Sequence, residues 1–312
     1  MIKFQFIEFS CVSNPIVPLL PAVKPPEIIF ESAQLGYGFY SRSCHLVGFG
    51  FDGTACFRKG TKDGPNAIRR VSGGIESYSP YLDADLNDLT FYDCGNLSLG
   101  ESENVDEQWA YASEAFSRML DSADLARNEI KVLTLGGEHS ISYASIAAYL
   151  KQYPDLVLLH LDAHADLRDG YEGHHYSHAS IIYRVQELFG AQHQLIQYGI
   201  RSGTKDEYSW MDKNNTRCHS LKAFLNKVDK IGSQTPIYLT LDLDYFDPAY
   251  FPGTGTPEPG GEDFHSFVSL AKQLKNKNFV GCDVVELAPN IDPTGNSDVF
   301  AAKIVRELLL CF

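Results

Sequence analysis

The sequence contains no run of 18 consecutive apolar residues, the length that a helix needs to cross a membrane. Near the amino terminus, Pro18 and Pro21 interrupt the apolar stretch 16–23, which makes it a poor core for a signal peptide. Basic residues are also scarce, because 26 Lys and Arg are outnumbered by 40 Asp and Glu, for a formal charge of −14. This excess of acid argues against nucleic acid or an anionic membrane as the main partner.

Cysteine patterns that stabilise small secreted domains or hold zinc are absent as well. The seven cysteines of the 312-residue chain are dispersed, and none forms a CxxC pair. Such an odd, scattered set indicates reduced thiols and neither a disulfide framework nor a cysteine-ligated zinc site. No GxxxxGK[ST] phosphate loop is present. We therefore expect a cytoplasmic protein with no membrane partner and no nucleic-acid partner.

The chain divides into a proline-rich beginning and one long alternating region. Within residues 1–43, five prolines prevent long regular elements, so we predict an amino-terminal arm, which could contact a neighbouring subunit. From residue 44 to 312, apolar runs of strand length alternate with segments of helical spacing, and no change in composition marks a linker. This pattern predicts a single α/β domain with a mainly parallel sheet covered by helices on both faces.

Three polar residues follow the apolar run 156–161, and they suggest a metal site. These are Asp162, His164 and Asp166, each separated from the next by one residue. Alternate residues of an extended chain point to the same side, so we expect the three to face a common volume. Two carboxylates and an imidazole gathered there would repel one another or shift their pKa values unless a cation were present. A capping Asp would explain one acid but not three convergent groups, whereas an ion-pair network is the other interpretation.

Two more strand ends supply similar groups, namely His139 after the strand 129–135, and Asp242 and Asp244 after the strand 237–241. The whole set contains four carboxylates, two imidazoles and no thiolate, which disfavours a structural zinc site. Mixed oxygen and nitrogen ligands suit Mn²⁺, with Fe, Co, Ni or Zn as competitors. Six ligands are more than one catalytic ion needs, and they suit two ions that share bridging carboxylates. The residues thus predict a dinuclear metallohydrolase.

Several longer motifs resemble those of the ureohydrolase family, which includes arginases and agmatinases. They are FDGTACFRKGTKDGPNAIR at 51–69, GGEHS at 136–140, DAHAD at 162–166, SHA at 177–179, DLDYFDP at 242–248, GTGTPEPGG at 253–261 and VVELAP at 284–289. Together they extend over residues 45 to 310 in the family's order. The resemblance implies a three-layer α/β/α fold, a ureohydrolase-like catalytic domain over 44–312, and hydrolysis of a guanidino group to urea and an amine.

The resemblance also assigns roles to individual residues. It implies two Mn²⁺ ions per subunit, with Asp162 and Asp242 bridging both. The remaining ligands would be His139 and Asp166 for one ion, and His164 and Asp244 for the other.

Three further roles follow from the same resemblance. Asp166 would also accept a hydrogen bond from the nucleophile and help to pass a proton to the leaving amine. His178 matches a histidine that shuttles protons between solvent and site, a task suited to an imidazole near neutral pH. Glu286 matches the carboxylate that pairs with the substrate guanidinium, whose planar fork favours such contacts. Family members are usually trimers or hexamers, so we expect a homo-oligomer.

The segment between DAHAD and the shuttle histidine bears on the substrate. Here it reads LRDGYEGHHYS, which departs from the arginase pattern and resembles the agmatinase branch, as does PEPGG. We therefore expect a small cationic guanidino substrate, agmatine, cleaved to putrescine and urea, with Asp169 or Glu172 near its amine. Guanidinobutyrate, guanidinopropionate and formiminoglutamate hydrolases share the core motifs, and their anionic tails would prefer a basic partner such as Arg168. Two further hypotheses are an enzyme that acts on arginine and an inactive metal-binding member of the family.

Overall fold

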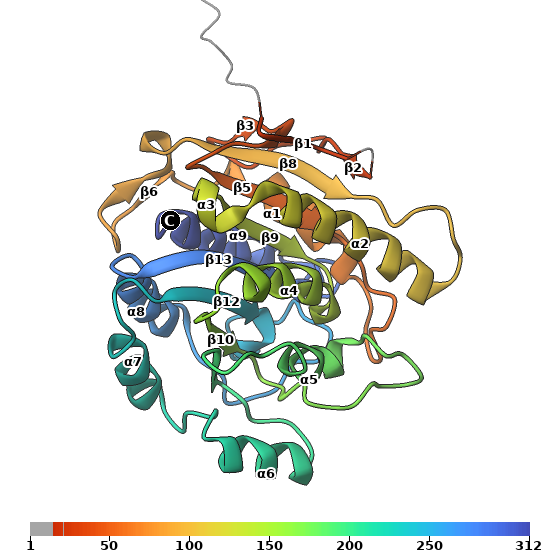
Figure 1. Cartoon of the computed structure of the whole chain (residues 1–312), viewed down its shortest axis with the longest axis vertical. Coiled ribbons are helices and arrows are strands. Elements are labelled where there is room, and N and C mark those ends of the chain that lie inside the picture. The colour runs from red at the N-terminus through yellow and green to blue at the C-terminus, as the bar shows by residue number, and fades with distance from the viewer. Residues whose placement is uncertain (1–14, 21) are drawn as a thin grey trace, which may run out of the picture.

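The structure is a computed structural model that describes residues 15–20 and 22–312 (Figure 1). Within these residues the central sheet has nine strands, and all but one of the pairings in it are parallel. The strands follow the order β11 (Gln194–Tyr198), β10 (Val157–Leu161), β12 (Pro236–Asp242), β13 (Asn278–Val285), β9 (Lys131–Gly136), β5 (Cys44–Phe49), β8 (Phe91–Leu97) and β2 (Val23–Lys24), and β3 (Gln34–Leu35) also pairs with β8. The exception is β2, which runs antiparallel to β8.

Helices cover both faces of this sheet and enclose a separate apolar core on each side. One face carries α1 (Gly64–Ser72), α7 (Leu221–Asp229), α8 (Phe264–Leu274) and α9 (Asn296–Leu309). The other carries α2 (Val105–Ala123), α3 (Leu125–Asn128), α4 (Ser142–Gln152), α5 (Ile181–Gln186) and α6 (Lys205–Asn214). In Figure 1, α2 and α4 lie in front of the sheet and α9 lies behind it. The predicted three-layer α/β/α fold with a mainly parallel central sheet is confirmed.

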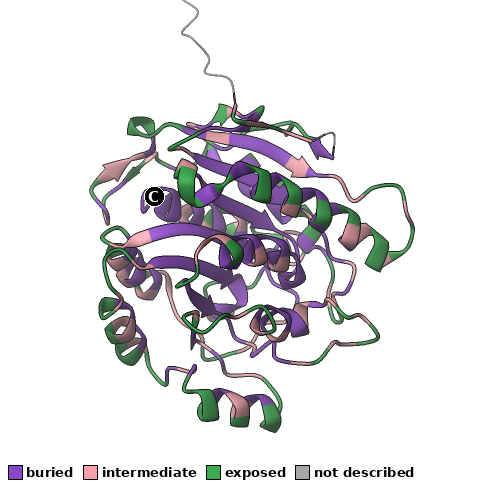
Figure 2. Cartoon of the chain, viewed as in Figure 1, coloured by how far each residue is buried: buried purple, intermediate pink, exposed green. Residues whose placement is uncertain are grey.

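The alternation of side chains along each strand explains the continuous apolar runs in the sequence. In β10, Leu159 and Leu161 belong to the core under α7 and α8, whereas Leu158 belongs to the core under α2 and α4. Because helices cover both faces, both sets must be apolar, as in other parallel sheets. Figure 2 shows the result, with the central strands buried and the exposed residues on the outer sides of the helices.

Short elements connect these layers. They are the two-residue strands β1 (Val17–Pro18), β4 (Gly38–Phe39), β6 (Tyr78–Ser79) and β7 (Ala84–Asp85), and the 3₁₀ turns η1 (Thr61–Asp63), η2 (Leu86–Asp88), η3 (His139–Ile141), η4 (His178–Ser180) and η5 (Leu243–Tyr245). Three of the turns, η3, η4 and η5, begin within motifs that the sequence marks as functional. Among the described residues, no helix is both long and apolar enough to span a membrane.

The predicted arm 1–43 lies partly outside the described residues, since residues 1–14 and 21 are not described. The described part of this arm contains short strands that join the sheet. Both β2 and β3 pair with β8 and extend the chain's own sheet, and the backbone N–H of Phe30 donates to Oδ2 of Asp93, 3.0 Å away. Prolines therefore shorten the strands here without excluding them. The division at residue 43 and contact with another subunit stay predictions.

Candidate metal centre

Four strands that are neighbours in the sheet, β10, β12, β13 and β9, deliver the candidate residues to one edge. His139 follows β9, Asp162 follows β10, Asp242 is the last residue of β12, and Glu286 follows β13. Since the strands are parallel, their carboxyl ends meet at one edge, where open α/β sheets usually bind ligands. Residues that are far apart in the sequence therefore lie close together in space.

The DAHAD segment converges by a turn, although its sequence suggested an extended chain. Strand β10 ends at Leu161, and Asp166 has a left-handed backbone with φ of 54°. The carbonyl of Asp166 accepts the N–H groups of Ile182 and Tyr183, at 3.0 and 3.1 Å, which holds this unfavourable conformation in place. The prediction that an extended chain brings these side chains together is therefore wrong, because a turn does so. The predicted convergence of the side chains is present.

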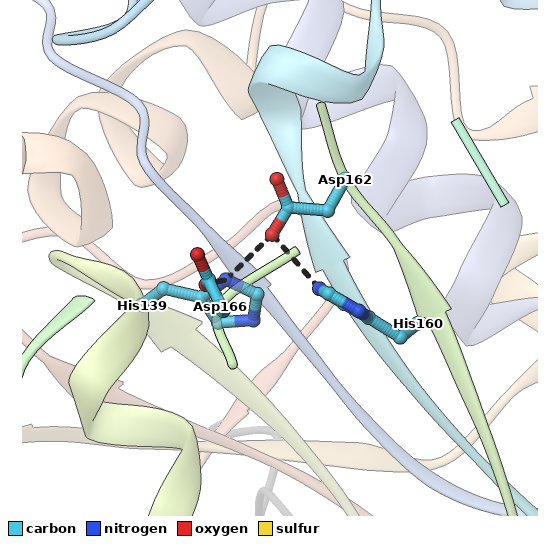
Figure 3. Close-up of side chains that lie close together, drawn as sticks. All are labelled: His139, His160, Asp162 and Asp166. Atoms are coloured by element: carbon cyan, nitrogen blue, oxygen red, sulfur yellow. Dashed lines mark hydrogen bonds and ion pairs between the residues drawn. The ribbon is translucent and has the colours of Figure 1, made fainter. Parts of the chain in front are cut away.

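His139 faces three carboxylates through a single ring nitrogen. Its Nδ1 atom lies 3.0 Å from Oδ2 of Asp162 and 3.0 Å from Oδ2 of Asp166 (Figure 3). The same atom lies 3.4 Å from Oδ2 of Asp242. The imidazole is almost fully buried, and none of these contacts has the geometry of a hydrogen bond for Nδ1. The atom is thus aimed at a small volume bounded by carboxylate oxygens.

The opposite nitrogen of His139 indicates which tautomer fits. Nε2 lies 2.8 Å from the hydroxyl oxygen of Thr240, and that hydroxyl donates to Oδ1 of Asp283 at 2.6 Å. Since the Thr240 hydrogen is used by Asp283, Nε2 is the ring nitrogen that donates, and Nδ1 is the one that carries a lone pair when the ring is neutral. A lone pair directed at three carboxylates is unfavourable unless a cation lies between them. This arrangement fits a metal ligand oriented by an outer partner.

A second group of ligand-type atoms shares Asp162 with the first. Nδ1 of His164 lies 2.9 Å from Oδ2 of Asp244 and 3.5 Å from Oδ1 of Asp162. The Asp162 carboxylate therefore directs one oxygen toward His139 and the other toward His164. One ligand atom from each of Asp162, His164 and Asp244 lies within 4.8 Å of the others, and the same holds for the set of His139, His160, Asp162 and Asp166. Two groups joined by a common carboxylate are what a pair of bridged ions requires.

His160 joins this centre, although the sequence gave no reason to select it. It lies in β10 two residues before Asp162, and its Nε2 atom lies 2.8 Å from Oδ2 of that aspartate. Gln197 on the neighbouring strand β11 donates to Nδ1 of His160 at 3.1 Å, so Nε2 is the nitrogen that carries the proton. His160 is thus a buried donor that fixes the direction of the Asp162 carboxylate.

Burial and the charges of this cluster raise the pKa values of three of its members. Burial alone would lower the pKa of His139, but its three carboxylate neighbours raise it well above the usual value. Burial and the charge of Asp162 raise the pKa of Asp166 to about 7, and burial with the charges of Asp244 and Asp162 raises that of Asp242 well above normal. Protons thus compensate the crowded charges of the cluster. Divalent cations could replace those protons, because a bound metal needs deprotonated ligands.

The oxygen and imidazole donors present therefore fit divalent ions. The residues that could hold them are His139, Asp162, His164, Asp166, Asp242 and Asp244.

A cavity of about 280 Å³ opens onto this cluster. Of the residues predicted for the site, His139, His164, Asp166, His178, Asp242 and Glu286 line it. Asp162 and Asp244 are buried beneath them.

Glu286 and His178 enter the cavity from different segments. Glu286 has a left-handed backbone with φ of 68°, and its Oε1 atom accepts the N–H of His139 at 2.8 Å. Burial and the charge of Glu138 raise the pKa of Glu286 well above normal.

The His178 ring meets the ring of Tyr171 edge to face, with 5.6 Å between centroids. Burial and the positive charge of His164 lower the pKa of His178 to about 4.

The two acids expected near the substrate amine do not line this cavity. Asp169 forms an ion pair with Arg184, and Glu172 is exposed. Instead, Glu207 from α6 and Arg168 are the charged side chains that line the cavity besides the residues predicted for the site. The Glu207 carboxylate accepts the N–H groups of residues 167 and 204, and the Arg168 guanidinium lies 4.6 Å from the Tyr171 ring centroid. The sequence missed Glu207 because its contact with the site depends on α6 packing beside the DAHAD loop.

The fold and the cluster are those of an α/β protein with a candidate metal centre at the carboxyl ends of its parallel strands. The family model described as Arginase family matches residues 42–311, and the chain belongs to this family of binuclear metal enzymes. The agmatinase of Bacillus cereus is 39% identical over 272 residues, which cover 85% of this chain and 90% of the relative. The agmatinase of Bacillus subtilis is 38% identical, with 86% and 91% covered.

A solved structure gives the same result. The agmatine ureohydrolase of Thermoplasma volcanium is 27% identical, with a TM-score of 0.76, and the match covers 91% of this chain and 93% of that one. The family prediction is therefore confirmed. The protein is a ureohydrolase, an enzyme that hydrolyses a guanidino C–N bond.

Proposed function

We propose that this enzyme hydrolyses agmatine to putrescine and urea, with two Mn²⁺ ions bound by the candidate metal centre. The observation that carries the choice of substrate is the charge of the cavity wall outside the candidate ligands. Among the described residues that line it, Glu286 and Glu207 are acidic and Arg168 is the only Lys or Arg. Agmatine is a dication with no carboxylate, so it suits such a wall better than arginine or an ω-guanidino acid does.

The candidate ligands suit manganese on chemical grounds. Carboxylate oxygens with two imidazole nitrogens form a mixed donor set that Mn²⁺ accepts readily. When bound, a pair of divalent ions lowers the pKa of water and so supplies a nucleophile at neutral pH. Asp162 offers one oxygen to each group of ligands and would hold both ions. Asp242, whose Oδ2 atom lies 3.4 Å from Nδ1 of His139, would hold the ion on the His139 side, and its proposed bridging role follows from the family resemblance.

Glu286 is proposed to bind the guanidinium of the substrate. Its carboxylate is buried, lines the cavity and is fixed by the N–H of His139. A buried carboxylate whose pKa is raised gains a partner when a cation arrives, which restores its charged form. Pairing with a planar guanidinium would hold the reactive carbon above the metal centre.

Asp166 and His178 are proposed to move protons. Asp166 lies within the first group of candidate ligands, and its carboxylate lines the cavity, so it can accept a proton from the nucleophile and return it to the leaving amine. His178 lines the same cavity, and its Nδ1 atom makes no hydrogen bond within the described part of the chain. Its lowered pKa keeps the ring neutral at pH 7, and a proton that it receives would be passed on readily.

One observation favours a second substrate, guanidinobutyrate. The Arg168 guanidinium lines the cavity and could pair with a carboxylate at the far end of that molecule. However, this side chain is also stacked on Tyr171, so part of its interaction capacity is already used. We therefore rank agmatine first.

The test is urea release by Mn²⁺-loaded protein from agmatine, arginine, guanidinobutyrate and guanidinopropionate in parallel, with formamide release followed from formiminoglutamate. The proposal predicts that kcat/KM is highest for agmatine. The chelator-treated protein is the control and should be inactive until Mn²⁺ is restored. A higher kcat/KM for guanidinobutyrate would give Arg168 the deciding role, and the absence of product from every compound would contradict the proposed activity.

A further inference from the structure

Thr54 connects three segments around the cavity that are far apart in the sequence. It lies in the loop between β5 and η1 and is buried. Its backbone N–H donates to Oε2 of Glu138 at 2.8 Å, and its hydroxyl donates to Oε1 of the same carboxylate. The N–H of His178 in turn donates to the Thr54 hydroxyl oxygen at 3.4 Å. Thr54 thus lies between the turn that carries His139 and the loop that carries His178.

The direction of these hydrogen bonds is set by Glu138. This buried carboxylate also accepts the hydroxyl of Ser140 at 2.7 Å, so it has three donors, two of them from Thr54. Because the carboxylate takes up the Thr54 hydrogen, the oxygen lone pairs of that hydroxyl remain for the N–H of His178. The Glu138 carboxylate therefore fixes the orientation of the Thr54 hydroxyl.

His178 needs such a partner because of its place in the chain. It is the first residue of η4, and the first N–H groups of a helical turn have no acceptor within the turn itself. Its ring has no polar contact that would fix it, since Nδ1 makes no hydrogen bond within the described residues and Tyr171 offers only an aromatic edge. The direction in which the imidazole points therefore depends strongly on where its backbone is held.

We propose that Thr54 is a positioning residue for His178. Its hydroxyl, oriented by Glu138, holds the first N–H of η4 and so keeps the imidazole directed into the cavity. This inference rests on the proton-transfer role of His178 in the proposed function. Sequence patterns gave no indication of it, because Thr54 is separated from Glu138 by 84 residues and from His178 by 124.

The chain offers a matched set of variants for testing this role. Thr54→Val replaces the hydroxyl with a methyl group of similar size, and Thr54→Ser keeps the hydroxyl. Ser140→Ala removes another hydroxyl from the same oxygen of Glu138 without touching His178. If Thr54 acts through His178, Thr54→Val should lower kcat by about tenfold, a fraction of what an acid–base group contributes, with KM changed by less than about twofold. Thr54→Ser and Ser140→Ala should keep kcat within about twofold of the wild type.

The decisive measurement is a double-mutant cycle with His178→Asn, carried out on the metal-loaded protein. When His178 is already absent, Thr54→Val should lower kcat by less than about twofold further, because the two residues act as a unit. An equal loss in both backgrounds would overturn the proposal, as would an equal loss in Ser140→Ala or a loss of bound metal in Thr54→Val. If Thr54→Val does not fold, Thr54→Ala is put through the same cycle.

The two proposals fail in different ways in this experiment. If the wild type prefers another guanidino compound, the substrate assignment is wrong, and the cycle is measured with the preferred compound. Full activity of His178→Asn would overturn the inference about Thr54, while urea release from agmatine by the wild type would still support the proposed activity.

Discussion

Nδ1 of His139 lies 3.0 Å from Oδ2 of Asp162, and the other oxygen of that carboxylate faces His164. The two imidazoles come from turns after different strands, and the single carboxylate between them connects two groups of ligand-type atoms. Asp162 therefore belongs to both groups. Loss of its charge should affect both proposed ions at once.

Asp162→Asn should therefore abolish binding of both ions. The amide oxygen can still accept hydrogen bonds, so the fold should survive, but the bridging charge is gone. We expect a larger loss of metal affinity than the roughly 10–100-fold that follows removal of an outer partner, together with loss of urea release. Metal content after dialysis and thermal unfolding would be measured beside Asp169→Asn, an acid of the same loop that should keep its metal. Two tightly retained ions would contradict the bridging role.

His160→Gln tests the buried donor that orients this carboxylate. Without the imidazole N–H at 2.8 Å, Asp162 should turn more freely, and we expect Mn²⁺ affinity to fall by about 10–100-fold. Activity at saturating Mn²⁺ should recover to near that of the wild type, because His160 is not proposed as a ligand. A titration of activity with Mn²⁺ separates the two quantities. Unchanged affinity would show that the orientation of Asp162 does not depend on His160.

Glu286→Gln should weaken substrate binding without removing metal. Replacing the buried carboxylate by an amide removes a charged partner of the guanidinium, which at roughly 1.5–3 kcal/mol corresponds to a KM increase of about 10–100-fold. Steady-state kinetics and metal analysis on the same sample would show this. Glu172→Gln, which changes an exposed acid outside the cavity, should leave KM unchanged. If KM instead rises in Glu172→Gln alone, the exposed loop recognises the substrate.

His45 should make the protein less stable in mild acid. Burial lowers its pKa to about 3, and its Nε2 atom accepts the N–H of Tyr40 at 2.9 Å, which requires a neutral ring. Because the folded-state pKa lies below the unfolded value of about 6.5, the unfolded state binds the proton first and stability falls as pH decreases. Between pH 7 and pH 5 this group should cost about 2 kcal/mol.

His45→Gln removes that titration while leaving an acceptor for Tyr40. Chemical unfolding of both proteins at pH 7, 6 and 5 should give parallel curves of stability against pH only if His45 plays no part. We expect the variant to lose about 2 kcal/mol less than the wild type over this range.

The sequence was most informative where side chains that can bind a metal directly follow a strand. Asp162, His164 and Asp166 follow an apolar run directly, and Asp242 and Asp244 do the same, so the fold rule for parallel sheets located them. Longer motifs added His178 and Glu286, and the structure brings both to the cavity. The roles of these residues stay predictions until the variants are measured.

Contacts between distant segments could not be predicted in this way. His160 looks like one more residue of a buried strand, and its partner Gln197 lies on the neighbouring strand. A serine just before a helical segment is typical of an N-cap, but helical turns already begin at His139, and the Ser140 hydroxyl instead donates to Glu138. The hydrogen-bond partner of each of these side chains depends on how distant segments pack, and a single sequence does not show that packing.

The most direct test of the central claim is a Mn²⁺ titration of chelator-treated protein, with bound metal and urea release from agmatine measured in each sample. The proposed dinuclear agmatinase should reach full activity when two ions are bound per chain. Full activity with one ion bound, or two bound ions with no urea released from agmatine, would contradict it.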